Sequence, residues 1–204
     1  MPVYYIISLS MGKKYIIGID EAGRGPLAGP VSVAGFFCEA INGSLIIGKV
    51  KYKDSKKFNE KNREKIYEKL EKNFAVSLIS HTHIDKYGMS SALAMGVENV
   101  LKELAEKFNI THENCFVVLD GTLKAPKQYK QKTIIRGDEN VEVIANASIF
   151  AKVTRDRYMV ELDKKYPQYE FTKHKGYGTK LHYEKIKQHG ISDVHRKSYL
   201  KRLT

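Results

Sequence analysis

The sequence predicts an α/β domain with one central sheet, followed by a helical and basic C-terminal segment. Short apolar runs bounded by turn residues alternate with stretches of helical periodicity, which is typical of a sheet covered by helices. With 204 residues, 42% of them hydrophobic, the chain is long enough for one buried core. The charge is uneven, because residues 151–204 hold 14 basic and 6 acidic residues, a net +8 of the chain's +12.

Five apolar runs predict β-strands. Each is only a few residues long and lies between residues that favour turns, which distinguishes a strand from a buried helix. In chain order these runs are 15–19, 31–38, 45–50, 74–80 and 116–119.

Helical periodicity and capping residues predict three helices. Asn59 can cap the first, Ser90 or Ser91 can open the second, and Thr179 can cap a short third helix that stops at Gly190. Apolar residues at three- and four-residue spacing give the first two helices a buried face. These residues are Ile66, Tyr67 and Leu70 in the first helix, and Leu93, Val97, Leu101, Leu104 and Phe108 in the second.

The cysteines and the N-terminus predict a cytoplasmic protein without a membrane anchor. Cys38 and Cys115 lie inside apolar runs, where we expect reduced core thiols rather than a disulfide or a metal site. The first ten residues are apolar but too short to span a bilayer, and they lack a basic start and a cleavage site. We therefore interpret residues 1–13 as a variable N-terminal extension, with Met11 as an alternative start.

The positive charge has two interpretations that composition alone leaves open. A lysine-rich surface can simply be solvated, whereas a cluster of basic residues can also bind a polyanion such as nucleic acid. The seven histidines show no spacing typical of zinc ligands. For His174, His182, His189 and His195 we expect surface or phosphate contacts.

A glycine-rich loop follows the first predicted strand, in the stretch GIDEAGRGPLAGPV at 18–31. It does not match a dinucleotide fingerprint, because Ala28 occupies the place of the third glycine. Pro26 and Pro30 lack backbone donors, and a second strand-like run follows where a phosphate-binding helix would begin. A structural turn would leave the two acids that precede the loop unexplained.

Those acids, Asp20 and Glu21, follow the apolar run 15–19 directly. Adjacent residues of a strand point to opposite faces, so we expect the strand to end there and the backbone to turn. Asp120 follows another apolar run, and Asp138 precedes an apolar helical stretch. Carboxylates gathered at one sheet end repel each other unless a cation neutralises them, and hard divalent ions prefer oxygen ligands. The four acids therefore predict a divalent-metal site.

Seven motifs in this order resemble those of ribonuclease HII, the type 2 ribonucleases H. The resemblance covers nearly the whole chain beyond residue 14, and its first and fifth motifs are long and specific. The motifs are GIDEAGRGPLAGPV at 18–31, DSKK at 54–57, LDG at 119–121, RGD at 136–138, ASIFAKVTRDR at 147–157, HKGYGT at 174–179 and HRKS at 195–198.

The resemblance implies a ribonuclease H-like fold, with a mixed central β-sheet flanked by helices and a C-terminal helical segment that helps to hold a duplex. We expect the catalytic domain to span 14–170 and the basic C-terminal segment 171–204. The implied activity is hydrolysis of the RNA strand of RNA–DNA hybrids, and incision 5′ of single ribonucleotides in duplex DNA. The products would carry a 3′-hydroxyl and a 5′-phosphate, and the protein would act as a monomer.

The resemblance also implies residue roles. The family's four catalytic and metal-binding acids correspond to Asp20, Glu21, Asp120 and Asp138, which would bind two divalent ions, Mg²⁺ or Mn²⁺. Backbone groups of the glycine loop would sense the ribose 2′-hydroxyl, and a tyrosine would pack on the neighbouring sugar. Lys56 and basic residues of 152–157 are candidates for phosphate contacts, with pairing on the helix surface as the alternative. The loop and tyrosine residues are Gly23, Arg24, Gly25 and Tyr177.

Some positions depart from the family pattern, but none of them is among the four acids or in the glycine loop. They are Thr122 where asparagine is frequent, Arg136 where lysine is common, the ending HRKSY, and Tyr87-Gly88. Two alternative functions stay open at this point. One is another nuclease of the same fold, such as a resolvase-like enzyme, and the other is a nucleic-acid-binding module without activity.

Overall fold

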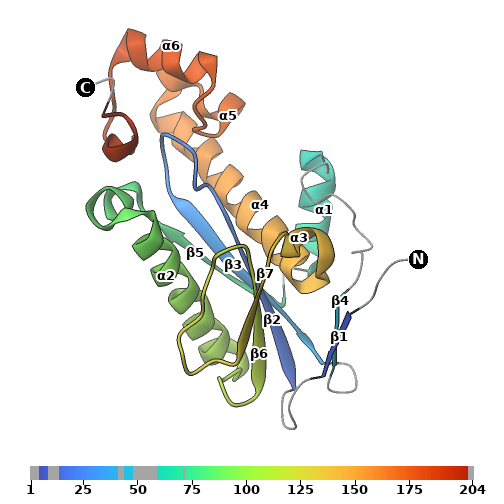
Figure 1. Cartoon of the computed structure of the whole chain (residues 1–204). Helices are drawn as coiled ribbons and strands as arrows, with labels where there is room; N and C mark the ends of the chain where they lie inside the picture. Colours follow the sequence, from blue (N-terminus) through green and yellow to red (C-terminus); the bar gives the residue numbers. More distant parts are fainter. Residues whose placement is uncertain (1–4, 9–13, 41–43, 48–58, 71, 202–204) are drawn as a thin grey trace.

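A computed structural model describes residues 5–8, 14–40, 44–47, 59–70 and 72–201. Within them a mixed five-stranded sheet has the order β5-β3-β2-β6-β7 (Figure 1). Strand β2 pairs antiparallel with β3 and parallel with β6, and β6 pairs parallel with β7. The strands are β2 (Tyr15–Ala22), β3 (Val31–Glu39), β5 (Phe74–Ile79), β6 (Cys115–Asp120) and β7 (Gln131–Ile134).

Four of the five predicted strands are confirmed as strands of this sheet. The fifth, at 45–50, corresponds to β4 (Ser44–Ile47), and its last three residues lie outside the described ranges. β4 pairs antiparallel with β1 (Tyr5–Ser8), which the sequence did not predict. β7 was also missed, because its four residues, QKTI, are mostly polar and are only partly buried or exposed.

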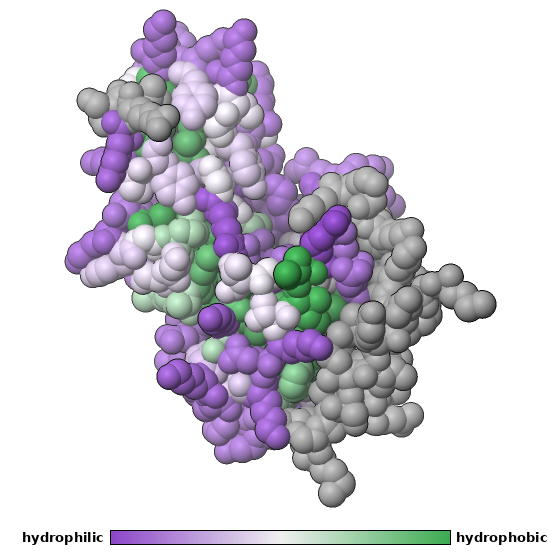
Figure 2. All heavy atoms as spheres, viewed as in Figure 1, coloured by the Kyte–Doolittle hydropathy of each residue, from purple (hydrophilic) through white to green (hydrophobic). Residues whose placement is uncertain are grey.

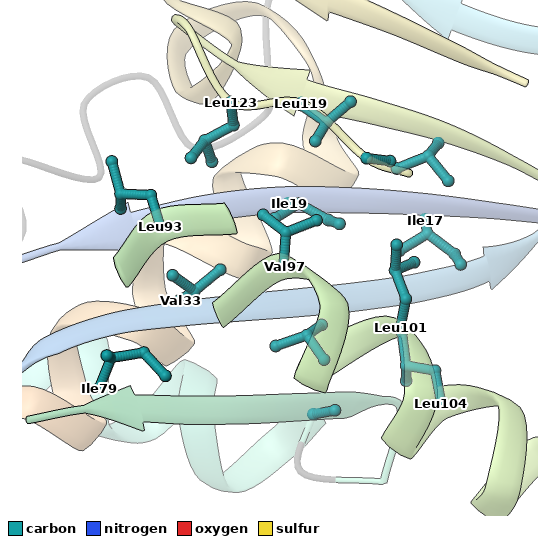
Figure 3. Packing of buried hydrophobic residues seen from close by; sticks show 14 of the residues in the cluster. Ile17, Ile19, Val33, Ile79, Leu93, Val97, Leu101, Leu104, Leu119 and Leu123 are labelled. Carbon is teal, nitrogen blue, oxygen red and sulfur yellow. The ribbon is translucent and has the colours of Figure 1, made fainter. Parts of the chain in front are cut away.

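Two long helices cover the two faces of the sheet (Figure 1). Helix α2 (His81–Phe108) buries Val97, Leu101 and Leu104 against the sheet, as Figure 3 shows from close by. Helix α4 (Glu142–Lys165) packs on the opposite face, where Phe150 stacks on Phe36 and Phe74. Helix α1 (Glu60–Leu70) adds Tyr67 to this second cluster, and Asn59 caps it as predicted by accepting a hydrogen bond from Asn62 N.

The predicted start of the second helix at Ser90 or Ser91 is wrong. Ser80 is the N-cap, since its hydroxyl accepts a hydrogen bond from His83 N, and the helix begins at His81. Gly88 has non-helical dihedral angles, with φ at 83°, and divides α2 into two parts. The sequence signal for a start near Ser90 therefore reflects the second part, which resumes after this kink.

Gly18 allows α4 to lie directly on β2. A Cβ atom at this position would lie 2.2 Å from the carbonyl carbon of Val143, well inside the closest approach of real atoms. The backbones of the strand and the helix are thus in contact at the N-terminal end of α4. This close approach places the next turn of α4 beside Asp20.

The C-terminal part of the chain packs on the far end of α4 and on the glycine-rich loop (Figure 1). Its core combines Leu27 and Ala28 of the loop with Met159 of α4 and with Phe171 and Ile186. Hydrophilic side chains cover much of its visible face (Figure 2). The elements are η1 (Pro167–Tyr169), α5 (Phe171–His174), α6 (Lys180–His189) and η2 (Lys197–Tyr199).

Thr179 caps α6 and the helix stops at Gly190, as predicted. Cys38 and Cys115 form no disulfide, as predicted, and Cys115 is buried whereas Cys38 is only partly buried. Among the described helices, none is both long enough and apolar enough to cross a membrane.

Candidate active site

Strand β2 continues past the point where β6 stops pairing with it. The β2–β6 ladder ends at Ile19 and Leu119, whereas β2 pairs with β3 as far as Ala22 and Ser32. Asp20 and Glu21 therefore lie within the strand, and the prediction that the strand ends before them is wrong. The antiparallel partner β3 holds this protruding stretch in extended form, so the two acids stand at the sheet edge above the end of β6.

Asp120 and Asp138 reach the same edge from the two neighbouring strands. Asp120 is the last residue of β6, and β7 leads through Arg136 into α3 (Gly137–Asn140), which carries Asp138. The N–H of Gly137 donates a hydrogen bond of 2.6 Å to Asp120 Oδ1, which ties the start of α3 to the end of β6. Because β2, β6 and β7 run parallel, all four candidate acids follow or lie at the carboxyl ends of adjacent strands.

Burial and mutual repulsion make ionisation of Asp20 unfavourable. Its side chain is 4% exposed, and burial raises its pKa well above the ordinary value, with further increases from the charges of Glu21 and Asp120. A hydrogen bond from Ser148 on α4 lowers this pKa only in part. Burial likewise raises the pKa of Glu21, to which the charge of Asp120 adds. Three carboxylates thus share one electrostatic environment.

This environment fits a divalent cation. The candidate donors are all carboxylate oxygens, the hard ligands that Mg²⁺ and Mn²⁺ accept. Glu21 Oε2 is buried and has no hydrogen-bond partner among the described residues, so a ligand position is available there. Within the part of the chain that the structure describes, no group of three His, Cys, Asp or Glu side chains is arranged to hold a metal ion as it stands.

Arg24 connects the candidate acids with the glycine loop. Its Nε donates a hydrogen bond of 2.5 Å to Glu21 Oε1, and its Nη1 lies 3.3 Å from Thr122 Oγ1, so that hydroxyl accepts a second bond. Thr122 follows Asp120 by two residues, at the position where the sequence departs from the family pattern. Arg24 therefore links the loop after β2 with the loop after β6.

A pocket of about 420 Å³ opens beside the acids. Glu21 and the glycine loop line one side of it, and Tyr177, 38% exposed, lines another. Cationic side chains also line it, from Arg63 on α1 and Lys152 on α4. The predicted substrate-binding residues Gly23, Arg24, Gly25 and Tyr177 thus share one pocket with Glu21, whereas Lys56 lies outside the described residues.

For Arg155 of segment 152–157, the prediction of phosphate contacts is wrong. Arg155 is fully buried and donates hydrogen bonds to the carbonyls of Ala28, Pro30 and Lys175. Burial lowers its pKa to about 10, which leaves it charged at neutral pH. Arg157 pairs with Glu64 on α1, which was the stated alternative of surface pairing. Only Lys152 of the three basic residues lines the pocket, where it also pairs with Asp156.

The expectation of surface or phosphate contacts is also wrong for three of the four histidines. His174, His182 and His195 are buried in the C-terminal part, at 7%, 0% and 0% exposure. The rings of His174 and His182 stack at 4.2 Å between centroids, and Nε2 of His182 lies 3.1 Å from Nε2 of His195. Because each ring nitrogen of His182 and His195 has a partner inside the protein, neither ring is open to a phosphate.

Sequence reasoning missed three features of this site: Ser148 beside Asp20, Arg63 in the pocket and Thr122 beside Arg24. Ser148 lies in the motif ASIFAKVTRDR, yet a serine inside a helical pattern carries no sign of its partner. The position of Arg63 depends on the packing of α1 against α4, which a single sequence does not reveal.

Comparison with solved structures defines the class of protein. Ribonuclease H2 from Pyrococcus horikoshii OT3 superposes with a TM-score of 0.65 at 24% identity, covering 93% of this chain and 96% of that one. Bst-RNase HIII in complex with Mn²⁺ gives 0.60 at 15% identity, covering 93% of this chain and 66% of that one. The fold is therefore the ribonuclease H-like α/β fold that the sequence predicts.

Sequence comparison then identifies the family. The family model for ribonuclease HII matches residues 17–202. Ribonuclease HII of a Sulfurihydrogenibium species is 42% identical over 193 residues, 93% of this chain and 92% of the relative. Ribonuclease HII of Fusobacterium nucleatum is 46% identical over 195 residues, 93% of this chain and 87% of the relative.

The chain belongs to the ribonuclease HII family. It is a type 2 ribonuclease H, a hydrolase that acts on the RNA of RNA–DNA hybrids, and such enzymes depend on divalent metal ions.

Proposed function

We propose that this ribonuclease H also incises duplex DNA on the 5′ side of a single embedded ribonucleotide, leaving a 3′-hydroxyl and a 5′-phosphate. In this proposal Asp20, Glu21, Asp120 and Asp138 hold two divalent ions, Mg²⁺ or Mn²⁺. Bound there, such ions supply an activated water and stabilise the leaving 3′-oxygen. The support for this assignment is the shared electrostatic environment of three of the acids and the position of the fourth on α3.

The observation that carries the proposal is the pocket that joins Glu21 with the glycine loop and Tyr177. An enzyme that distinguishes ribose from deoxyribose must form hydrogen bonds with the 2′-hydroxyl. The backbone of Gly23–Gly25 can approach a sugar closely, since Gly25 has open space where a Cβ atom would be. Tyr177 offers a half-exposed ring for the adjoining sugar, with Lys152 and Arg155 over its face.

The other residues of the pocket have complementary roles in this account. Ser148 orients the Asp20 carboxylate, and Arg24 fixes one oxygen of Glu21 while the other faces the site. Lys152 and Arg63 provide positive charge for the phosphates that flank the scissile bond. We further propose that the protein acts as a monomer in the cytoplasm.

Incision of a labelled DNA duplex with one central ribonucleotide, with and without Mg²⁺ or Mn²⁺, tests the proposal. We expect a single cut 5′ of the ribonucleotide, only with the ion, and a 3′ end that a DNA polymerase extends. Asp20→Asn and Asp138→Asn should lower the rate by at least about 10³-fold, the order of magnitude seen when a central catalytic group is removed. An all-DNA duplex of the same sequence is the control.

Three results would contradict the proposal. They are cleavage of the all-DNA duplex at the same rate, a product with a 3′-phosphate, and near wild-type activity of Asp138→Asn. The molar mass measured by light scattering at the assay concentration tests whether the protein is a monomer.

A further inference from the structure

Arg196 is a buried cation that is held mainly by backbone carbonyls. Its side chain is 0% exposed, and within the described residues no carboxylate lies within ion-pair distance of it. Its guanidinium instead donates four hydrogen bonds to the glycine-rich loop, of 2.7 to 3.0 Å. The acceptors are the carbonyl oxygens of Gly23, Arg24, Gly29 and Pro30.

Two of these bonds fix the orientation of the peptide planes that face the pocket. Each trans peptide unit is planar, with its N–H pointing opposite to its C=O, and the described chain has no cis peptide bond. Because the carbonyls of Gly23 and Arg24 point toward Arg196, the N–H groups of Arg24 and Gly25 point away from it. Both residues line the pocket, and neither N–H donates to another described residue.

A second side chain of the C-terminal segment holds the same peptide plane. The hydroxyl of Tyr199 donates a hydrogen bond of 2.9 Å to the Arg24 carbonyl, and the Arg196 guanidinium lies 5.3 Å from the Tyr199 ring centroid. The backbone continues this contact, since Arg196 N donates to Leu27 O over 2.7 Å. Rotation of the Gly23–Gly25 peptides would leave a buried guanidinium without its acceptors, which is strongly unfavourable.

We propose that Arg196, supported by Tyr199, is a positioning residue for sugar recognition. It turns the Gly23 and Arg24 carbonyls inward and thereby presents two backbone N–H donors to the 2′-oxygen of a ribonucleotide. This inference rests on the proposed function, because it assigns the means by which the same pocket selects ribose. Through Arg196 and Tyr199, the C-terminal segment takes part in selecting ribose as well as in binding the duplex.

Tyr166, at the C-terminal end of α4, provides a matched comparison for Tyr199. Its hydroxyl also donates one hydrogen bond, of 2.7 Å, but to Asp193 Oδ1 and not to the glycine-rich loop. Arg155 is no such comparison, because it lies against Gly23 and over the Tyr177 ring. A purely structural role of the tyrosine hydroxyls predicts equal effects of substitution at Tyr166 and Tyr199, whereas positioning of the sugar-facing peptides predicts unequal effects.

The test is a discrimination ratio, the Kd for an all-DNA duplex divided by the Kd for the same duplex with one ribonucleotide. It is measured by fluorescence anisotropy in the Asp20→Asn background, where the substrate is not turned over. Arg196→Lys, Tyr199→Phe and Tyr166→Phe are added separately, and thermal melting confirms that each variant is folded. Tyr199→Phe leaves no cavity in the core, because Tyr199 is 38% exposed.

We expect Tyr199→Phe to lower the ratio by about 2- to 10-fold, as for one hydrogen bond, and Arg196→Lys by about 10-fold or more. Tyr166→Phe should change it by no more than about 2-fold. If Arg196→Lys does not fold, Tyr199→Phe decides alone. An unchanged ratio in Tyr199→Phe, or an equal loss in Tyr166→Phe and Tyr199→Phe, would overturn the inference. A ratio near one in the parent protein would instead contradict the proposed function.

Discussion

Buried polar side chains in this protein act mainly by fixing the backbone around the pocket. Arg155 and Arg196 remain charged in the interior because carbonyl oxygens surround their guanidinium groups, which replaces the hydrogen bonds lost from water. For Asp20, burial instead disfavours the charged form, because its neighbours include the carboxylates of Glu21 and Asp120. A divalent cation would relieve this repulsion.

The buried histidines predict a pH dependence of stability. The carbonyl of Tyr177 lies 3.0 Å from His182 Nδ1, and Ser192 N donates to His195 Nδ1. The ring-to-ring contact therefore requires the neutral form of both rings, with His195 Nε2–H donating to His182 Nε2. Burial lowers the pKa of both rings to about 4. Stability from this pair is present above pH 6.5 and is lost as pH falls from about 6.5 to about 4.

Urea unfolding between pH 7.5 and 4.5, with NMR titration of the ring ¹³Cε1 signals, checks this prediction. We expect the free energy of unfolding to fall below about pH 6.5, while the His182 and His195 rings stay neutral until close to pH 4. Titration of the buried rings near pH 6.5 would show that they are open to solvent.

At the residue scale, the sequence indicated where the acids lie but not where the buried cations lie. Asp20, Glu21, Asp120 and Asp138 were found because each is next to an apolar run, so the strand pattern alone brings them to one edge. Nothing in a single sequence distinguishes Arg196 from a surface arginine, since its partners are carbonyls of a loop some 170 positions away. The burial of His182 was hidden for the same reason.

At the scale of elements, the site depends on the contact between β2 and α4. Gly18 permits this contact, and one turn further along α4 Ser148 reaches Asp20. The sequence predicted β2 and the helix after Asp138, because the spacing of apolar residues and the length of an apolar run are local signals. It did not predict that β2 extends to Ala22, since that extension depends on pairing with β3.

Gly18→Ala should be strongly destabilising, because its Cβ would meet the Val143 backbone rather than a side chain that can move. We expect a loss of about 1–3 kcal/mol or more, a fall in Tm of several degrees. Gly25→Ala is the stability control, since its Cβ would have no atom within 4 Å, and should change the free energy of unfolding by no more than about 0.5 kcal/mol. Similar melting temperatures for both variants would contradict the close packing of α4 on β2.

At the scale of the whole molecule, the positive charge is less available than composition indicates. Of the 14 basic residues in 151–204, Arg155 and Arg196 are buried, and Lys152 and Lys173 pair with nearby acids. Lys180 keeps 92% of its side chain exposed although its Nζ lies 3.9 Å from Glu184 Oε1, so it can still contact a duplex.

This reduced charge predicts a moderate dependence of duplex binding on salt. If about 3–6 phosphates are neutralised, a plot of log K against log salt concentration should have a slope of roughly −3 to −5. Fluorescence anisotropy titrations of a hybrid duplex at several KCl concentrations between about 50 and about 300 mM measure this slope. A flat response would exclude the basic surface from binding, and Lys180→Gln should reduce the slope by about one or less.

The central claim is that four carboxylates at the ends of β2, β6 and β7 hold divalent ions, and calorimetric titration of Mn²⁺ tests it most directly. We predict that Asp20→Asn and Asp138→Asn each weaken Mn²⁺ binding by about tenfold or more, while their far-UV circular dichroism stays unchanged. Glu161→Gln, on an exposed carboxylate of α4, should bind Mn²⁺ like the wild type. Wild-type affinity for Mn²⁺ in both aspartate variants would contradict the account.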